Sequence, residues 1–137
     1  MSKTCKKSCL CGGVALEVTP LEESVHVCHC SLCQTWNGGP AFAVSIEPEW
    51  KTEGEDKLKW FDSSEWGQRG FCSECGTHMI FRTKDGSYNG VCAPIDGMAD
   101  FKIGEHIFVD RKPFDYDFSD NTPRLTAQQF HEMIGAA

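Results

Sequence analysis

The sequence lacks a long apolar run. No stretch of its 137 residues approaches the roughly 20 apolar residues that span a membrane. The first residues, MSKTCKKSCLCGG, carry charge but not the apolar segment of a secretory signal. We therefore expect a cytoplasmic protein with no membrane partner, in which thiols stay reduced.

Basic residues are also scarce. The chain has 13 Lys and Arg against 20 Asp and Glu, which gives a net charge of −7. The basic clusters are only the pairs Lys6-Lys7 and Arg111-Lys112. Proteins that bind nucleic acid normally present a basic face, because neutralising phosphate supplies most of their affinity. We expect no nucleic acid partner.

No internal repeat or linker divides the chain, so residues 1–137 are predicted to form a single all-β domain. Val14, Leu16 and Val18 alternate with other residues at the two-residue period of a half-buried strand. Similar short segments rich in β-branched or aromatic residues lie at 24–30, 41–46, 57–61, 69–72, 78–82 and 88–92. Many short strands separated by polar turns predict an all-β fold, a complex folded sheet.

Two short helices are predicted beside these strands. Thr126 is placed to cap a C-terminal helix at 127–134, in which Phe130 and Ile134 share one face. Another is expected after Cys33, and the glycines of Asn37-Gly38-Gly39 should end it quickly.

Cysteine, by contrast, is abundant, with nine in the chain. Seven fall in three clusters, which are Cys9-Leu10-Cys11, Cys28-His29-Cys30 with Cys33, and Cys72-Ser73-Glu74-Cys75. In Cys-x-Cys on an extended segment, both side chains project to the same face. In Cys-x-x-Cys a tight turn brings the sulfurs to one side, and Gly76 allows the backbone a positive φ there. These spacings favour metal binding.

The seven thiols divide most simply between two zinc ions. Structural zinc takes four ligands, and pairs from distant segments hold a fold together best. We therefore predict a structural zinc on Cys9, Cys11, Cys72 and Cys75. Cys28, Cys30 and Cys33 are then predicted to form a second, open zinc site, because three protein ligands and a vacant fourth position are usual at catalytic zinc.

Three other interpretations remain at this point. Disulfides need an oxidising compartment, which neither the odd cysteine count nor the missing signal indicates. An iron–sulfur cluster could use four thiols, but the spacings match none of the usual ferredoxin patterns. Finally, both ions could be structural, with His29 or a distant carboxylate completing the second site.

The remaining candidates are more typical of structural roles. We expect Cys5 to be an exposed N-terminal thiol and Cys92 a small core residue. His78 and His106 lie among apolar residues, where a hydrogen-bonded structural histidine is more frequent than a ligand, whereas His26 and His131 are expected at the surface. We expect the aromatic residues to fill the core; they are Trp36, Phe42, Trp50, Trp60, Phe61 and Trp66.

Four segments together resemble a known family. They are SCLCGGVALEV, CHCSLCQTWNG followed by AFA, GFCSECGTHMIFR and HIFVDRKPFDYD, which extend with their neighbours from about Ser8 to Arg124. The chain is similar in these motifs to the glutathione-dependent formaldehyde-activating enzymes, also called S-(hydroxymethyl)glutathione synthase-like proteins. It differs at Phe114, where the family usually has tryptophan. We therefore assign none of the family's substrate contacts to the segment around Phe114.

The resemblance implies a fold, a reaction and a set of ligands. The fold would be a folded sheet like that of a small zinc-binding chaperone of Rab GTPases. The reaction would be carbon–sulfur lyase chemistry on the adduct of glutathione and formaldehyde. The family's structural zinc would lie on Cys9, Cys11, Cys72 and Cys75, and its catalytic zinc on Cys28, Cys30 and Cys33.

This chemistry suits an open three-thiolate site. Zinc with three thiolates is a poor Lewis acid toward water but can hold a fourth thiolate. Glutathione bound through sulfur would become a nucleophile toward the carbonyl carbon of formaldehyde, and the reverse reaction would break the carbon–sulfur bond. Two alternatives are a non-enzymatic zinc module that binds a protein partner, and a sensor of thiol-reactive electrophiles.

Overall fold

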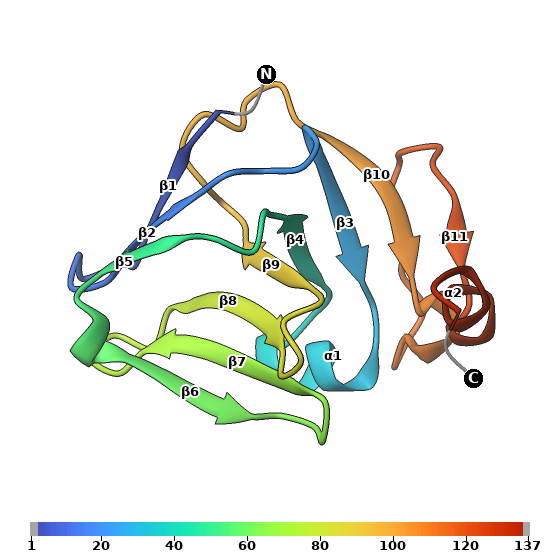
Figure 1. Ribbon diagram of the computed structural model, residues 1–137. Coiled ribbons are helices and arrows are strands. Elements are labelled where there is room, and N and C mark those ends of the chain that lie inside the picture. Colours follow the sequence, from blue (N-terminus) through green and yellow to red (C-terminus); the bar gives the residue numbers. More distant parts are fainter. Residues whose placement is uncertain (1–2, 136–137) are drawn as a thin grey trace. The chain divides into compact units, whose positions relative to one another are not determined.

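The computed structural model describes residues 3–135 (Figure 1). Its contacts divide the chain into two compact units. The first comprises the segment up to Glu23 together with Val44–Asp100, and the second comprises Ser24–Ala43 and the segment from Phe101 onward. No helix in the described chain is both long and apolar enough to cross a membrane. That the whole chain is a single domain stays a prediction.

The first unit contains two groups of antiparallel strands. A three-stranded sheet has the order β1-β2-β5, and four further strands follow in the order β9-β8-β7-β6. The bounds are β1 Cys5–Ser8, β2 Ala15–Val18, β5 Lys51–Glu53, β6 Leu58–Asp62, β7 Gly67–Cys72, β8 His78–Thr83 and β9 Asn89–Cys92. A single turn of 3-10 helix, Glu55–Lys57, joins β5 to β6.

Alternation of apolar side chains builds the core of this unit. Leu16 and Val18 on β2 are fully buried, whereas Glu17 between them is exposed. Side chains from β8 and β9 add to the buried set, among them Met79, Ile80 and Val91. Burying each such side chain contributes about 1.5–3 kcal/mol relative to leaving it exposed. The predicted strand at 14–18 is confirmed from Ala15 onward.

The second unit is built on strands in the order β11-β10-β3-β4. Their bounds are β3 Ser24–Cys28, β4 Ala41–Ser45, β10 Lys102–Ile107 and β11 Arg124–Leu125. β10 lies parallel to both β3 and β11, and Ile107 is opposite Cys28. β4 pairs with β3 and its last residues belong to the first unit. This parallel pairing places the end of β10 beside the residues that follow β3.

Two α-helices lie in the second unit. α1, Ser31–Asn37, begins directly after Cys30 and ends at Gly38, which has the left-handed φ of 77°. It therefore starts two residues before Cys33 and contains it, earlier than the sequence predicted, while the predicted glycine stop is confirmed. α2, Ala127–Met133, begins at Thr126, whose hydroxyl accepts from the backbone N–H of Gln129 in a complete capping box.

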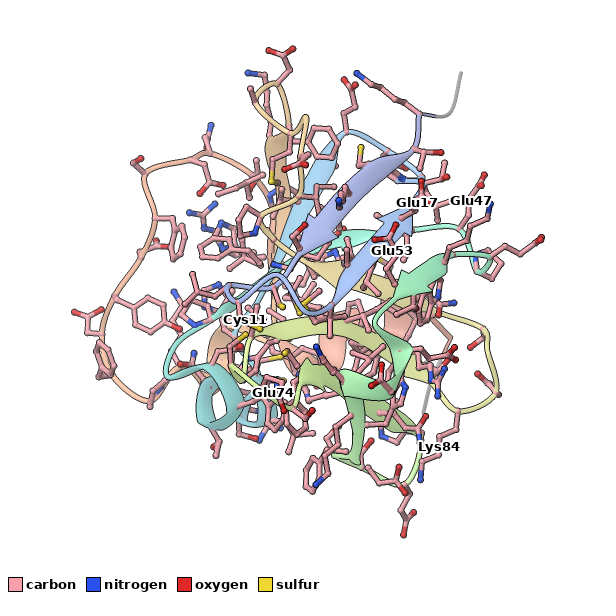
Figure 2. The ribbon with its side chains drawn as sticks, turned by 90° about the vertical axis from the view of Figure 1, so that its left-hand side faces the viewer. Cys11, Glu17, Glu47, Glu53, Glu74 and Lys84 are labelled. Carbon is pink, nitrogen blue, oxygen red and sulfur yellow. The ribbon has the colours of Figure 1, made fainter. Side chains whose placement is uncertain are left out.

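The expectation that aromatic residues fill the core was wrong. Phe42, Phe61 and Trp66 are 41%, 52% and 60% exposed, and the other aromatic side chains named above are only half-buried. The core is instead built mainly from valine, isoleucine and leucine. Acidic side chains also lie outside it: Glu17 and Glu53, both labelled in Figure 2, line one shallow hollow together with Lys6 and Lys51. That the protein has no nucleic acid partner stays a prediction.

Candidate metal centres

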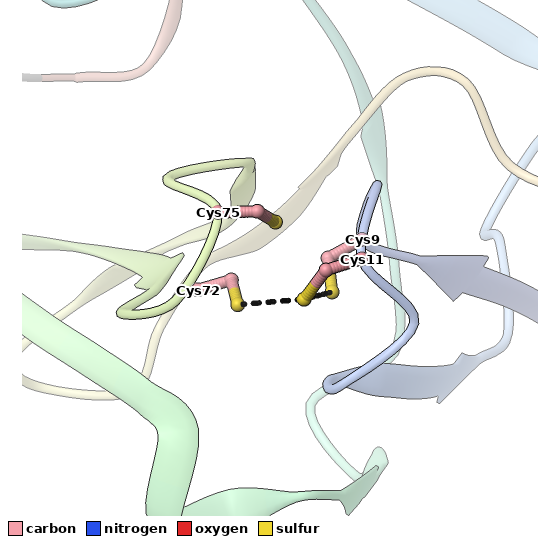
Figure 3. A group of neighbouring side chains, drawn as sticks. All are labelled: Cys9, Cys11, Cys72 and Cys75. Carbon is pink, nitrogen blue, oxygen red and sulfur yellow. Dashed lines mark hydrogen bonds between the residues drawn. The ribbon is translucent and has the colours of Figure 1, made fainter.

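Four thiols of the first unit converge from two segments more than sixty residues apart. Cys9 and Cys11 follow β1, whereas Cys72 ends β7 and Cys75 lies in the turn after it. Figure 3 shows the four sulfur atoms pointing toward one another. All four lie within 4.8 Å of one another, and the Cys9–Cys11 and Cys11–Cys72 sulfurs are 3.6 and 3.8 Å apart.

These distances fit a tetrahedral metal ion. Four sulfurs at the usual Zn–S distance of about 2.3 Å lie about 3.8 Å apart. Neutral thiols interact only weakly at these distances, whereas a divalent cation stabilises four thiolates at this separation. The residues present therefore fit zinc, and the four-cysteine cluster joins the N-terminal segment of the unit to the end of β7.

Backbone and hydroxyl groups hold the four-cysteine cluster in place. The N–H of Val14 donates to the sulfur of Cys9 at 3.2 Å. Thr77 accepts from the N–H of Leu10 at 3.1 Å, so its hydroxyl hydrogen is available to the sulfur of Cys75 at 3.2 Å. That hydrogen bond is the main reason why the pKa of Cys75 is lowered to about 5. Thr77 thus connects the two cysteine pairs, a role that its sequence position did not indicate.

The three thiols of the second unit also converge. Cys28 ends β3, Cys30 caps α1, and Cys33 lies in the first turn of that helix, where its N–H donates to the sulfur of Cys30 at 3.3 Å. The three sulfur atoms lie within 4.8 Å of one another. No fourth histidine, cysteine or carboxylate among residues 3–135 joins this group.

Repulsion between the three thiolates of the second unit favours a bound cation. Interactions with the Cys30 and Cys33 thiols, followed by burial, raise the pKa of Cys28 far above its ordinary value. The reason is that three thiolates this close repel one another. A soft divalent cation would remove this repulsion, so the donor set fits zinc.

His29 is not available as a ligand in this arrangement. Its side chain is fully buried, and both ring nitrogens already have partners. Nδ1 lies 2.8 Å from the hydroxyl of Tyr116, and Nε2 lies 2.9 Å from Nδ1 of His106. The alternative in which His29 completes the second site is therefore wrong for this structure, and burial lowers the pKa of His29 to about 4.

The hydrogen bonds of His29 continue through the unit. Nε2 of His106 lies 3.0 and 3.1 Å from the two carboxylate oxygens of Asp120. Asp120 also accepts from Thr122 and from Arg124. The prediction that His106 is hydrogen-bonded is confirmed, and His106 lies in neither of the metal-ligand groups found among the described residues. Tyr116 and Asp120 were missed, because no local pattern in the sequence connects them to His29.

The two cysteines outside the clusters do not have their predicted environments. Cys5 is buried on β1, with 8% of its surface exposed, whereas Cys92 at the end of β9 is half-buried. The reason is that Cys5 belongs to a strand whose alternate side chains turn inward. Neither residue lies in the two metal-ligand groups found among the described residues.

Fold and site together define an all-β protein with one four-cysteine and one three-cysteine cluster suited to metal. A sequence model described as the glutathione-dependent formaldehyde-activating enzyme matches residues 4–111. The chain belongs to this family, which is the family that its motifs resembled.

Individual relatives agree with this assignment. An uncharacterized lyase of Schizosaccharomyces pombe is 26% identical over 129 residues, which are 93% of this chain and 94% of that protein. A Talaromyces marneffei protein named for glutathione-dependent formaldehyde activation is 37% identical over 82 residues, covering 56% of this chain but only 44% of that protein. Together with the family match, these names support an enzyme of the lyase class.

The fold has a relative of known structure. A crystal structure of a Rhodobacter sphaeroides protein superposes with a TM-score of 0.52 at 19% identity. The match covers 87% of this chain and 98% of that chain. At this identity the likeness concerns the fold alone.

Proposed function

We propose that the protein is a zinc-dependent carbon–sulfur lyase that acts on the adduct of a small thiol and an aldehyde. Glutathione and formaldehyde, which form S-(hydroxymethyl)glutathione, are the pair that the family description favours. The observation that carries the proposal is the three-cysteine group, which gathers three thiols without a fourth protein ligand among the described residues. A site of this kind leaves one position for a substrate sulfur.

In this proposal the two cysteine groups have different roles. Cys9, Cys11, Cys72 and Cys75 would hold a structural zinc, and their full set of four donors leaves no place for substrate. Cys28, Cys30 and Cys33 would hold the second zinc, which when bound supplies stabilisation of a substrate thiolate. α1 keeps Cys33 in position, because the sulfur of Cys30 caps the helix and accepts a hydrogen bond from the N–H of Cys33 in its first turn.

The reaction then needs few further groups. The bound thiolate sulfur attacks the carbonyl carbon of the aldehyde, and the carbonyl oxygen gains a proton to become the hydroxyl of the adduct. In the opposite direction the hydroxyl loses its proton as the carbon–sulfur bond breaks. The chain must therefore bind the thiol, take up its proton and deliver a proton to oxygen.

Metal content and thiol binding test this function. Elemental analysis of protein purified without chelator should give about two zinc ions per chain in the wild type and about one in Cys28→Ser. In cobalt-substituted wild-type protein, glutathione should change the visible spectrum, and Cys28→Ser should lose this response. Cys92→Ser, which removes a half-buried thiol outside both clusters, is the matched control and should behave as wild type.

The opposite result has a definite meaning. One zinc ion in both wild type and Cys28→Ser, with no spectral response to glutathione, would contradict the lyase proposal. It would favour a zinc module that binds a protein partner, for which Phe114 of the second unit, 69% exposed, offers an apolar contact.

A further inference from the structure

A chain of four hydrogen-bonded side chains runs through the second unit, which also carries the three-cysteine group. It leads from Tyr116 through His29 and His106 to Asp120, with donor–acceptor distances of 2.8, 2.9 and 3.0 Å. Both imidazoles are completely buried, whereas Tyr116 is only half-buried. Two stacked histidines between a carboxylate and a phenol are not needed to fill a core that valine or leucine would fill.

The direction of these hydrogen bonds follows from Asp120. Thr122 donates to its carboxylate, and with His106 and Arg124 it holds the pKa of Asp120 far below its ordinary value. An ionised carboxylate only accepts, so Nε2 of His106 carries a hydrogen. Nδ1 of neutral His106 must then accept from Nε2 of His29, and Nδ1 of His29 must accept from the hydroxyl of Tyr116.

One added proton reverses the whole chain. If His106 becomes an imidazolium, both of its nitrogens donate, so Nε2 of His29 accepts and Nδ1 of His29 donates to the oxygen of Tyr116. The hydroxyl hydrogen of Tyr116 is then free to donate outward. His29 is neutral in both states and only exchanges one tautomer for the other. The added positive charge lies beside the carboxylate of Asp120.

The outer end of the chain is held by the segment that carries the three thiols. The oxygen of Tyr116 contacts His29, which separates Cys28 from Cys30. It also accepts from the side-chain amide of Gln34, which directly follows Cys33 on α1. Because Tyr116 is half-buried, it can exchange a proton with a bound molecule or a bridging water, which the buried histidines cannot do directly.

We propose that Tyr116, backed by His29, His106 and Asp120, is the group that carries the proton of the reaction from the thiol sulfur to the aldehyde oxygen. This inference rests on the proposed lyase function and supplies the proton transfer that the function requires. Tyr116 exchanges the proton, His106 holds it, and Asp120 stabilises the charge. His29 is a positioning residue that relays between them.

The proton and electron pairs balance in both steps. When the thiol binds, its S–H bond breaks and the electron pair stays on sulfur. Tyr116 gains that proton as its own passes to Nδ1 of His29, and the proton on Nε2 of His29 passes to His106. When sulfur attacks carbon, the π pair of the carbonyl moves to oxygen, and the reverse transfers deliver the proton there. No proton is gained or lost overall.

Other charged groups around the chain are few. Lys112 donates to the backbone carbonyl of Tyr116 at 2.9 Å and lies over its ring. Asp117 pairs with Lys112 and Arg124, and Arg124 also contacts Asp120. Apart from Asp120, none of these groups hydrogen-bonds to either imidazole within the described residues, so the proton on His106 is stabilised by Asp120.

Counting protons tests the proposal without measuring activity. A free thiol with a pKa of about 8.5 is protonated at pH 7, so binding as thiolate displaces about one proton per chain. In a weakly buffered solution with a pH indicator, wild-type zinc-loaded protein should release close to zero protons on binding glutathione. Tyr116→Phe should release about one. Tyr88→Phe, which removes the only other tyrosine hydroxyl of the chain, is the matched control and should behave as wild type.

Each alternative result is decisive. If wild type and Tyr116→Phe release the same number of protons while both bind glutathione, the proton-transfer proposal is wrong and the lyase proposal stands. If the cobalt-substituted wild type shows no response to glutathione, both proposals fail together.

A second measurement needs no variant and guards against misfolding of Tyr116→Phe. ¹⁵N NMR of the wild-type imidazoles should show His29 and His106 as neutral tautomers protonated at Nε2 before glutathione is added. With glutathione bound, His106 should carry protons on both nitrogens, and His29 should be protonated at Nδ1 instead. A neutral His106 in the glutathione complex would overturn the proposal.

Discussion

Thr77 shows how a single side chain can join the two halves of a cysteine cluster. Its oxygen accepts from the N–H of Leu10, between Cys9 and Cys11, and its hydrogen is directed to the sulfur of Cys75. Groups that hydrogen-bond to metal ligands orient them and tune their basicity, and removing such a group typically costs 10–100-fold in metal affinity. Thr77 therefore contributes to the four-cysteine cluster without being a ligand.

We predict that Thr77→Val weakens zinc binding at the four-cysteine cluster by about tenfold or more, because the sulfur of Cys75 and the N–H of Leu10 both lose a partner. Competition with a chromophoric chelator measures this affinity. Thr83→Val removes a hydroxyl that contacts Ser87 and Tyr88 instead, and it should leave zinc affinity unchanged. Equal affinities in the two variants would show that Thr77 has no such role.

At the scale of elements, the turn after β5 is fitted closely to the segment that carries Cys11. Gly54 has a left-handed φ of 73°, and a Cβ atom built there would overlap the carbonyl oxygen of Gly13. Gly86, in the turn between β8 and β9, has a nearly identical φ of 79°, but a Cβ there meets nothing within 4 Å. A side chain at Gly86 would thus cost only the strain of a left-handed backbone, whereas one at Gly54 would add a steric overlap with Gly13.

Gly86→Ala should lower the free energy of unfolding by about 1–2 kcal/mol, the cost of the left-handed conformation alone. Gly54→Ala should cost clearly more, because the backbone must also move away from Gly13 and so displace the Cys11 segment. Urea unfolding of the zinc-loaded proteins measures the difference. A loss in Gly54→Ala no larger than in Gly86→Ala would contradict the close contact.

At the scale of the whole molecule, burial of histidine makes stability depend on pH. His26 on β3 was expected at the surface, but burial lowers its pKa to about 4. In an unfolded chain a histidine has a pKa of about 6.5. Between these two values the unfolded chain binds more protons than the folded one, so the free energy of unfolding falls as the pH falls.

We therefore expect the urea midpoint of the wild type to fall as the pH is lowered from about 6.5 to 4. His26→Gln should lose less stability over this window, since its side chain does not titrate. His131→Gln, a change of the same kind on α2, is the matched control and should follow the wild type. If His26→Gln and the wild type lose stability in parallel, protonation of His26 does not govern the acid response.

Much of the candidate site was readable from the sequence, because its geometry is local. The Cys-x-Cys and Cys-x-x-Cys spacings bring thiols together within two or three residues, and Thr126 caps α2 through the residue three positions later. The alternation in β2 likewise needs no partner to be recognised. These features depend on the backbone of one short segment, which its own residues specify.

Only the tertiary structure decided the rest. β1 was not predicted because its two lysines look polar, yet Lys7 is 4% exposed. β10 and β11 were missed because parallel pairing leaves no local turn signal. Tyr116 and His29 meet across 87 residues, and Tyr116 lies outside any helix or strand. The sequence determined which residues could bind metal and where its clearest strands begin, whereas long-range pairing of strands decided which side chains surround the thiols.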